Sequence, residues 1–168
     1  MVSTEDTFTD QEVPMTTNGL TTCLWFDGQA EEAANHYTSI FKNSKLGSVS
    51  HNAAGGAVLT VEFELNGQRF VALNGGPQFT FNESISFQIF CADQDEVDYY
   101  WNRLRQGGRE SQCGWLKDRY GVSWQVIPAV LPDLIGGPDP VKAKRATEAM
   151  LTMSKLDVAA LQQAYAGD

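Results

Sequence analysis

Residues 57–75 read AVLTVEFELNGQRFVALNG and contain the clearest structural signal in the chain. Apolar and polar residues alternate on both sides of the pair Asn66-Gly67, which is the pattern of strands with one buried face. An Asn-Gly pair between two such runs favours a tight β-hairpin, because both residues accept the positive φ that the turn requires. The sequence therefore predicts two antiparallel strands joined at this pair.

The residues before the hairpin predict a strand, a helix and a second strand. LTTCLWF (20–26) is rich in threonine and aromatic residues, which is typical of strands. DGQAEEAANHYTSIF (27–41) has apolar residues at helical spacing and two glutamates in its first turn. KLGSVSH (45–51) then predicts a strand, so that the first half of the chain runs strand, helix, strand, strand, strand.

The second half repeats this order of elements. SISFQIFC (84–91) predicts a strand and DQDEVDYYWNRLRQGG (93–108) a helix that ends at two glycines, and the runs SQCGWLKD (111–118) and VSWQVIP (122–128) predict further strands. When the two predicted helices are aligned, three apolar pairs coincide: Ala33 with Val97, Tyr37 with Trp101, and Ile40 with Leu104. We expect an α+β fold of paired βαβββ modules, about 20–77 and 84–128, within one domain that spans residues 20–168.

Both ends of the chain differ from the repeated part. Residues 1–19 are polar and acidic without a periodic apolar face, so we expect a flexible N-terminal arm. Residues 139–167 predict a helical tail in two pieces, which begin at Asp139-Pro140 and at Asp157. We expect a homodimer, because each module leaves sheet edges uncovered, and the last helix offers an apolar stripe to the second copy: Leu156, Val158, Leu161 and Tyr165.

Composition and charge argue against several classes of partner. The net charge of −9 and the pI of about 4.6 would repel a phosphate backbone or an anionic membrane, so we expect no nucleic acid and no membrane partner. The sequence contains no run of about 18 apolar residues and no secretory signal, which makes the cytoplasm the expected compartment. Cys23, Cys91 and Cys113 are too scattered for a disulfide framework, and we expect all three to be small buried residues.

Three segments together resemble one branch of the vicinal oxygen chelate superfamily: CLWFDGQAEEAANHYTSIF (23–41), CGWLKDRYGVSWQVIP (113–128) and AMLTMSKLDVAALQQAYAG (149–167). That superfamily contains glyoxalase I, bleomycin-resistance proteins and extradiol dioxygenases. The branch is the PhnB-like group, which is also called demethylubiquinone 3-methyltransferase-like. The resemblance implies paired βαβββ modules whose sheets form a cup around a ligand site, usually in a homodimer.

The resemblance also implies where metal ligands would stand. Metal-dependent members carry His, Glu or Gln near the starts of the opening strands and on the last strands of each module. Those positions fall at Thr21, Asn74, Ser84 and Gln125, where Gln125 takes the place of a glutamate because DRYGVSWQV aligns with the superfamily's Asp-Pro-x-Gly-Asn-x-x-Glu ending. Hydroxyl and amide groups do not offset the cost of stripping a divalent ion of water, so we expect no metal centre and no cofactor.

A ligand pocket without a metal is the remaining prediction. If Gln125 lines the cup, strand alternation places other side chains beside it. The predicted pocket combines aromatic rings with hydroxyl and amide groups, as sites for an organic small molecule do. It consists of Thr21, Cys23, Trp25, Asn74, Ser84, Ser86, Gln88, Ser123 and Gln125. The alternative is that these polar groups only hydrogen-bond one another across a closed barrel.

No catalytic residue stands out, so the sequence leaves open whether the protein is an enzyme. We interpret His36 as a solvent-facing or rim residue and His51 as a surface residue. Glu62 and Glu64 alternate with apolar residues, so we expect them on the solvent-facing side of a strand. No glycine pair follows a strand and opens a helix, as methyl transfer on a Rossmann sheet requires. The leading hypothesis is a small-molecule-binding protein of the glyoxalase/bleomycin-resistance type. The alternatives are a metal-dependent lyase or dioxygenase that uses Glu62, Glu64 or His51, and a non-catalytic dimeric interaction protein.

Overall fold

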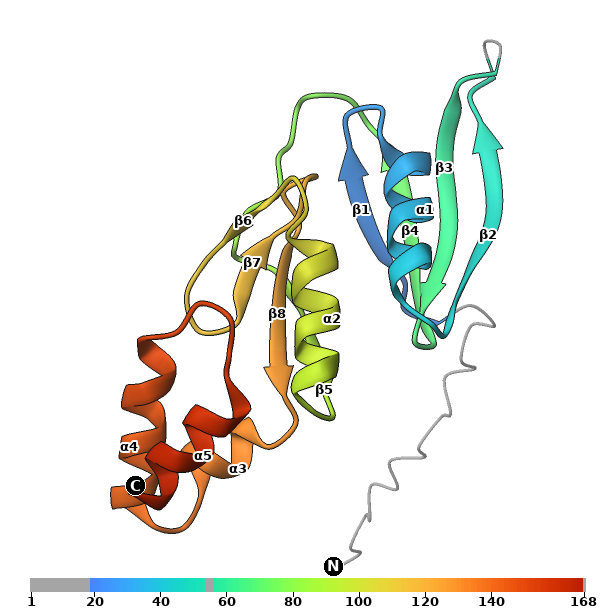
Figure 1. The fold of residues 1–168 in the computed structure, drawn as a ribbon. Coiled ribbons are helices and arrows are strands. Elements are labelled where there is room, and N and C mark those ends of the chain that lie inside the picture. The colour runs from blue at the N-terminus through green and yellow to red at the C-terminus, as the bar shows by residue number, and fades with distance from the viewer. Residues whose placement is uncertain (1–18, 54–55, 168) are drawn as a thin grey trace, which may run out of the picture.

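The structure is a computed structural model of the 168-residue chain, and it describes residues 19–53 and 56–167. The predicted N-terminal arm, apart from its last residue, lies outside this part. The first module consists of β1 (Thr22–Phe26), α1 (Ala30–Ile40), β2 (Ser44–His51), β3 (Val58–Leu65) and β4 (Gln68–Asn74). The second consists of β5 (Ser86–Cys91), α2 (Gln94–Leu104), β6 (Arg109–Glu110), β7 (Trp115–Lys117) and β8 (Ser123–Pro128). Three tail helices follow, α3 (Leu131–Gly136), α4 (Pro140–Leu151) and α5 (Val158–Ala166) (Figure 1).

The two modules have the same sheet topology. The first sheet has the strand order β1-β4-β3-β2 and the second has the order β5-β8-β7-β6. In each sheet the opening strand runs parallel to the last strand, and the other neighbours are antiparallel. The α+β fold of paired βαβββ modules is therefore confirmed.

The Asn66-Gly67 hairpin forms as its sequence predicts. Asn66 has a φ of 48° and Gly67 a φ of 83°, which matches a two-residue turn with positive φ at both positions. This turn sets the pairing of β3 with β4, in which Phe63 faces Phe70. Alternation then buries Val61, Phe63 and Leu65 against α1 and leaves Glu62 on the opposite face.

Two parts of the chain differ from the predictions. The run SQCGWLKD forms only the three-residue strand β7, because Cys113 (φ 56°) and Gly114 (φ 81°) interrupt the extended backbone. The tail contains three helices, since the six residues of α3 close a turn directly after β8. Asp139 and Asp157 cap α4 and α5 as predicted, by accepting hydrogen bonds from backbone N–H groups of the first turns.

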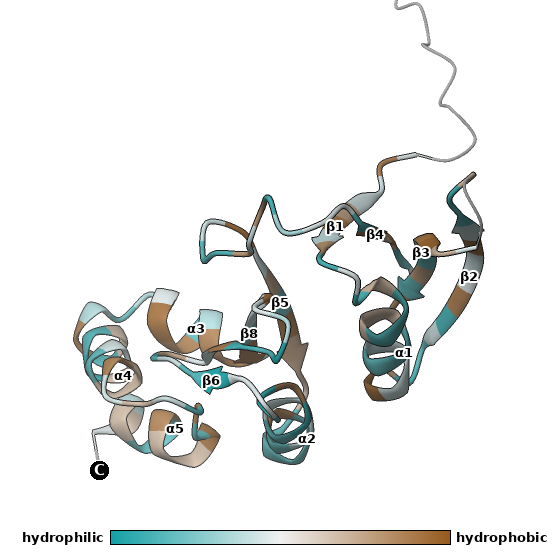
Figure 2. Ribbon diagram, turned by 90° about the horizontal axis from the view of Figure 1, so that it is seen from above, coloured by the Kyte–Doolittle hydropathy of each residue, from teal (hydrophilic) through white to brown (hydrophobic). Residues whose placement is uncertain are grey.

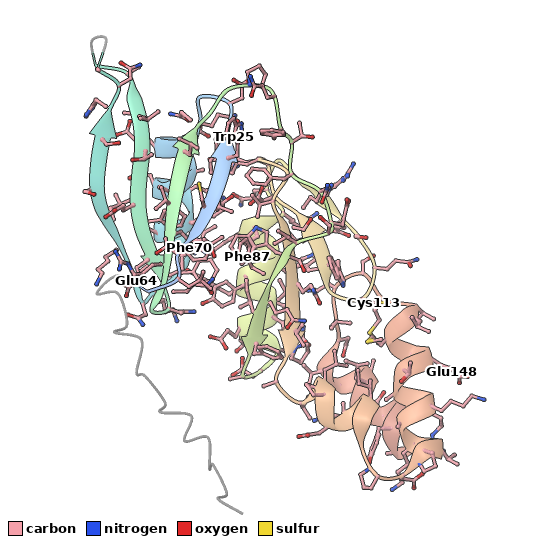
Figure 3. The ribbon with its side chains drawn as sticks, turned by 180° about the vertical axis from the view of Figure 1, so that it is seen from behind. Trp25, Glu64, Phe70, Phe87, Cys113 and Glu148 are labelled. Atoms are coloured by element: carbon pink, nitrogen blue, oxygen red, sulfur yellow. The ribbon has the colours of Figure 1, made fainter. Side chains whose placement is uncertain are left out.

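One apolar core is shared by both modules. The six helix positions paired by the internal repeat are all buried: Ala33, Tyr37, Ile40, Val97, Trp101 and Leu104. Phe70 of β4 meets Phe87 of β5 with ring centroids 5.3 Å apart, and the two residues lie side by side between the sheets (Figure 3). Tyr37 of α1 lies 5.5 Å from Trp124 of β8. The modules are therefore packed against each other through aromatic side chains.

The tail helices form a second, smaller core against the end of β8. Leu156 and Leu161 are fully buried there, together with Ile127 and Leu131. The prediction that Leu156 and Leu161 contact a second copy is wrong, because their side chains are already used within the chain. No helix among the described residues has the length and apolar character needed to cross a membrane.

Helices α1 and α2 lie on the same side of the two sheets, and the tail helices gather at the far end of the second module (Figure 2). The opposite faces of both sheets are turned toward the viewer in Figure 3. Within the part of the chain that the structure describes, no helix covers the strands on these faces, and the large apolar side chain of Phe90 is exposed there. The predicted pocket residues belong to these open faces or to the ends of their strands.

Candidate functional site

The structure divides the predicted pocket residues into three groups. Cys23, Ser84 and Ser123 line a common cavity at the seam between the modules. Ser86, Gln88 and Gln125 hydrogen-bond one another on the second sheet, and Asn74 and Trp25 are engaged by backbone groups of the first module. Thr21 precedes β1 and does not line the cavity.

The seam cavity has a volume of about 190 Å³ and collects residues from three parts of the chain. Cys23 comes from β1, Ser84 from the segment that connects the modules, and Ser123 from β8. Among the described residues, no charged side chain lines it, and most of its wall is formed by apolar side chains: Leu24, Phe81, Ile85, Phe87 and Val122. A mainly apolar concave space with a few polar groups is the usual form of a small-molecule site.

Ser123 has an unusual position in this wall. Its side chain is 1% exposed, and its Oγ has no hydrogen-bond partner. Leaving a buried hydroxyl unpaired costs on the order of 1–3 kcal/mol. The hydroxyl of Ser84, in contrast, donates to the side-chain oxygen of Asn82. Ser123 therefore keeps both an unused donor and an unused acceptor beside the cavity.

Gln125 does not line this cavity. Both ends of its amide form hydrogen bonds within the second sheet. Its Nε2 donates to Ser86 Oγ at 2.8 Å, and its Oε1 accepts from Gln88 Nε2 at 3.2 Å. Gln88 and Phe90 instead border a second cavity of about 190 Å³, which opens at the other end of the seam. Phe87 lines both cavities and so contributes to the wall of each.

Asn74 caps helix α1. Its Oδ1 accepts from the backbone N–H of Ala30 at 2.8 Å, and its Nδ2 donates to the carbonyl of Val58 at 3.0 Å. Gln29, at the N-cap position itself, makes no side-chain capping bond, so Asn74 takes this role from β4. Trp25 is likewise engaged, since its indole N–H donates to the carbonyl of Gly76 at 2.8 Å.

The four positions that the resemblance assigned to metal ligands do not fit a divalent ion. The amides of Asn74 and Gln125 are already engaged, and only Ser84 of the four residues lines the seam cavity. Within residues 19–53 and 56–167, no three His, Cys, Asp or Glu side chains gather as a metal site would require. That the functional protein contains no metal ion stays a prediction.

The residues of the metal-dependent alternative lie on the first sheet, away from the seam cavity. Glu64 forms an ion pair with Lys45 at 3.2 Å, and Glu62 is exposed beside it. His51 is exposed at the end of β2. Glu64 is labelled at the lower edge of the first module in Figure 3, far from the connecting segment.

Asp118 is a buried polar residue that the sequence analysis missed, and it lies outside the wall of the seam cavity. It is 3% exposed, and its Oδ2 accepts from the hydroxyl of Tyr37 at 2.7 Å and from the indole N–H of Trp124 at 2.8 Å. Its Oδ1 accepts from the backbone N–H groups of Tyr120 and Val122. Burial raises the pKa of Asp118, against the lowering effect of these hydrogen bonds. The only sequence signal was an aspartate that opens the turn DRYG, which is an ordinary turn residue.

The remaining histidine and cysteine predictions have mixed outcomes. His36 is half-buried between the rings of Tyr37 and Tyr120, which agrees with the expected rim position, and burial lowers its pKa. Cys91 is buried as predicted, and burial raises the pKa of its thiol to about 12. Cys23 is exposed, contrary to the prediction, because it lies on the face of β1 opposite α1.

Comparisons with known proteins agree with this architecture. The sequence profile of the 3-demethylubiquinone-9 3-methyltransferase family matches residues 18–127. The solved structure of a PhnB protein from Bacillus cereus, described as a 3-demethylubiquinone-9 3-methyltransferase, is 37% identical, with a TM-score of 0.61 over 66% of this chain and 98% of its own. A protein from Pseudomonas aeruginosa has the same fold at 18% identity, with a TM-score of 0.55 over 65% of this chain and 96% of its own. Among curated proteins, none matches the chain.

Two βαβββ modules with equal sheet order, packed side by side, define the vicinal oxygen chelate class of proteins. Within that class, the chain belongs to the 3-demethylubiquinone-9 3-methyltransferase family, the PhnB-like branch. The match ends at residue 127, so helices α3, α4 and α5 lie beyond the part that the family profile covers.

Proposed function

We propose that the protein binds a small organic molecule in the seam cavity, as a member of the glyoxalase/bleomycin-resistance type that works without a metal centre. The observation that carries the proposal is the convergence of Cys23, Ser84 and Ser123 on one mainly apolar cavity. These three residues come from both modules and from their connection, and all three were predicted for a ligand site from the sequence. A cavity built between two halves of a fold is a frequent place for a ligand.

Methyl transfer, which the family's name suggests, is not part of this proposal. A donor site on a Rossmann sheet needs a parallel sheet and a Gly-rich turn between a strand and a helix. Here each sheet contains one parallel pair, and the turn between β1 and α1 supplies only Gly28. The name therefore describes the family and gives no residue to which the transfer could be assigned.

We further propose that the protein is a cytoplasmic homodimer. Exposed apolar side chains on the connecting segment and on β5 support the dimer, because Phe79 is 64% exposed, Ile85 71% and Phe90 56%. Exposed apolar side chains of this size are usual where a second protein surface packs. Light scattering at micromolar concentration should give twice the mass of the chain, and the mass of a single chain would contradict the proposal.

The ligand proposal can be tested with Cys23 as a reporter, because its thiol lines the cavity and is exposed. In a Cys113→Ser chain, Cys23 is the accessible thiol, since Cys91 is buried. Toluene, as a probe for the apolar cavity, should slow the alkylation of Cys23 by N-ethylmaleimide in a saturable manner. A Cys23→Ser chain is the control, because Cys113 lies beside the tail helices and should react at the same rate with and without toluene.

A blocking variant locates the effect. Ser84 is exposed and lines the cavity, so a Ser84→Trp chain should fold and place its indole in the space that toluene would occupy. Protection of Cys23 by toluene should then disappear. If toluene leaves the alkylation rate of Cys23 unchanged in the Cys113→Ser chain that keeps Ser84, the cavity does not take up small molecules and the proposed function is wrong.

A further inference from the structure

We infer that the ligand of the seam cavity is a compact, uncharged ring compound with one hydroxyl or carbonyl group that hydrogen-bonds Ser123, an inference that rests on the proposed function. It names a chemical class of ligand and one residue that selects it. Three properties of the cavity carry the inference: its volume, the absence of charge in its wall, and the unpaired hydroxyl of Ser123.

The volume sets the size of the ligand. The cavity measures about 190 Å³. An apolar protein cavity of about 150 Å³ holds one benzene molecule. The part of the ligand that lies inside the seam cavity is therefore about the size of a single ring with one small substituent.

The wall sets the charge of the ligand. Aliphatic and aromatic side chains dominate it, and its polar members are neutral hydroxyl, thiol and amide groups. The nearest acidic residue along the chain, Glu83, pairs with Lys117 at 2.7 Å and with Arg109 at 3.5 Å, and none of these three charged residues lines the cavity. A charged ligand would lose its hydration without gaining a counter-charge, so an uncharged ligand is favoured.

Ser123 sets the functional group of the ligand. Its register partners on the neighbouring strands, Ser86 and Lys117, form hydrogen bonds or ion pairs with Gln125 and Glu83, and neither reaches Ser123 Oγ. A serine hydroxyl can both donate and accept, so it pairs with a hydroxyl or with a carbonyl. A ligand group at this point would satisfy a polar atom that folding leaves buried and unpaired.

Phenol and toluene provide the test, because they have nearly the same shape and differ by a hydroxyl in place of a methyl group. Their dissociation constants are measured by calorimetry on the full chain, its Ser123→Ala variant and its Ser39→Ala variant. The ratio of the toluene constant to the phenol constant should fall by about five- to tenfold in Ser123→Ala, which corresponds to the loss of one hydrogen bond. Toluene binding itself should be unchanged in that variant.

Ser39→Ala is the matched control, since it removes an exposed hydroxyl on α1 that donates to the carbonyl of His36 and lies outside the cavity wall. The ratio should stay at its value in the unaltered chain. Circular dichroism should show that Ser123→Ala is folded, because the substitution leaves no polar group unpaired. If Ser123→Ala does not fold, the same measurement is made on Ser123→Cys. Its thiol is a weaker donor, so the ratio of the toluene constant to the phenol constant should fall by a smaller factor.

The outcomes separate the two proposals. If both probes protect Cys23 from alkylation but the ratio is the same in Ser123→Ala as in the unaltered chain, the role of Ser123 is wrong and the seam cavity remains the binding site. If neither probe protects Cys23, the cavity is not a binding site and both proposals fail. Calorimetric binding without protection of Cys23 would place the probes elsewhere, for example in the aromatic cavity at the other end of the seam, and would also overturn both.

Discussion

Asp118 connects the two modules although its sequence context is that of a simple turn. Its carboxylate holds the hydroxyl of Tyr37, which lies 81 positions earlier in the chain, and the indole of Trp124. Together with two backbone N–H groups, these donors satisfy a charge that is almost entirely buried. Breaking such an arrangement by changing one partner costs more than the arrangement contributes to stability, because the other groups then lie buried without partners.

We expect Asp118 to give the protein a measurable dependence of stability on pH. Because burial raises the pKa of Asp118, the folded protein binds this proton more tightly than the unfolded chain does. Its stabilising contribution is therefore complete below the unfolded pKa of about 4 and is lost as the pH rises through the raised folded pKa. An Asp118→Asn chain lacks this contribution, so the unfolding free energy of the unaltered chain minus that of the variant should fall as the pH rises above about 4.

The measurement is urea denaturation of both chains at several pH values between about 4 and 7, a window that begins at the unfolded pKa. The variant should also be less stable throughout, by about 1–3 kcal/mol, because its amide N–H₂ opposes the donors of Tyr37 and Trp124. Asp139→Asn is the control without a pH dependence in this window. Backbone hydrogen bonds lower the pKa of Asp139, so its contribution is lost only as the pH falls below about 4, and its difference should stay constant between about pH 4 and 7. A difference for Asp118→Asn that does not vary with pH would contradict the prediction.

Helix α1 begins at a residue that another element caps, and Asn74 should therefore matter for stability. Replacing Asn74 with alanine removes the bonds to the N–H of Ala30 and the carbonyl of Val58. We expect a loss of about 1–2 kcal/mol, the usual cost of a lost helix cap. Asn74→Asp keeps the acceptor and loses only the donor, so its loss should be smaller. Urea denaturation in the presence of a chelator measures both, and full stability of Asn74→Ala under these conditions would show that Asn74 does not cap α1.

Gln94 of α2 is one of the polar contacts that attach the tail to the second module, beside the ion pair of Lys155 with Asp98. Gln94 donates to the carbonyl of Leu156 at 3.2 Å and accepts from the N–H of Val158 at 2.8 Å, which is the first residue of α5. Replacing Gln94 with alanine should speed the backbone hydrogen exchange of α5 and leave that of β3 unchanged, since β3 lies in the other core. Gln162→Ala, an exposed change on α5, should alter neither. Equal exchange of α5 in all three chains would mean that the other contacts of the tail hold α5 without Gln94.

We expect the shared aromatic core to make the two modules one folding unit. Phe87 contacts Phe70 of the first module and Trp124 of its own, so it contributes to the packing of both. Phe87→Ala should lower the unfolding free energy by about 2–3 kcal/mol, less than for a fully buried ring, because Phe87 is only partly buried. Far-UV circular dichroism and tryptophan fluorescence should still report one common transition, because neither half keeps a complete core without the other.

Phe79→Ala is the matched change for this experiment. Its ring is mostly exposed and meets only the edge of Trp25 among the described aromatic pairs, so its loss should have a much smaller effect. If the two probes report separate transitions in Phe87→Ala, the modules fold independently and the shared core is not what joins them.

The amino-acid sequence by itself determined the elements and their order. The alternation around Asn66-Gly67, the helical spacing of Ala33, Tyr37 and Ile40, and its recurrence at Val97, Trp101 and Leu104 are local patterns. Backbone geometry converts such patterns into strands and helices with a defined buried face, wherever these residues lie in the molecule. Paired βαβββ modules followed from that repetition.

Only the tertiary structure decided which polar groups are already engaged. In the sequence, Asn74, Gln125 and Ser123 are equivalent as neutral polar residues on predicted strands. In the folded protein, Asn74 caps α1 and Gln125 forms hydrogen bonds with Ser86 and Gln88, whereas Ser123 alone of the three has no partner. Likewise, the carboxylate of Asp118 meets a hydroxyl from the other module. Hydrogen-bond satisfaction depends on the positions of atoms that are distant in the chain, so no local pattern carries it. The seam cavity, which is bounded by β1, β8 and the connecting segment, exists for the same reason only in the folded molecule.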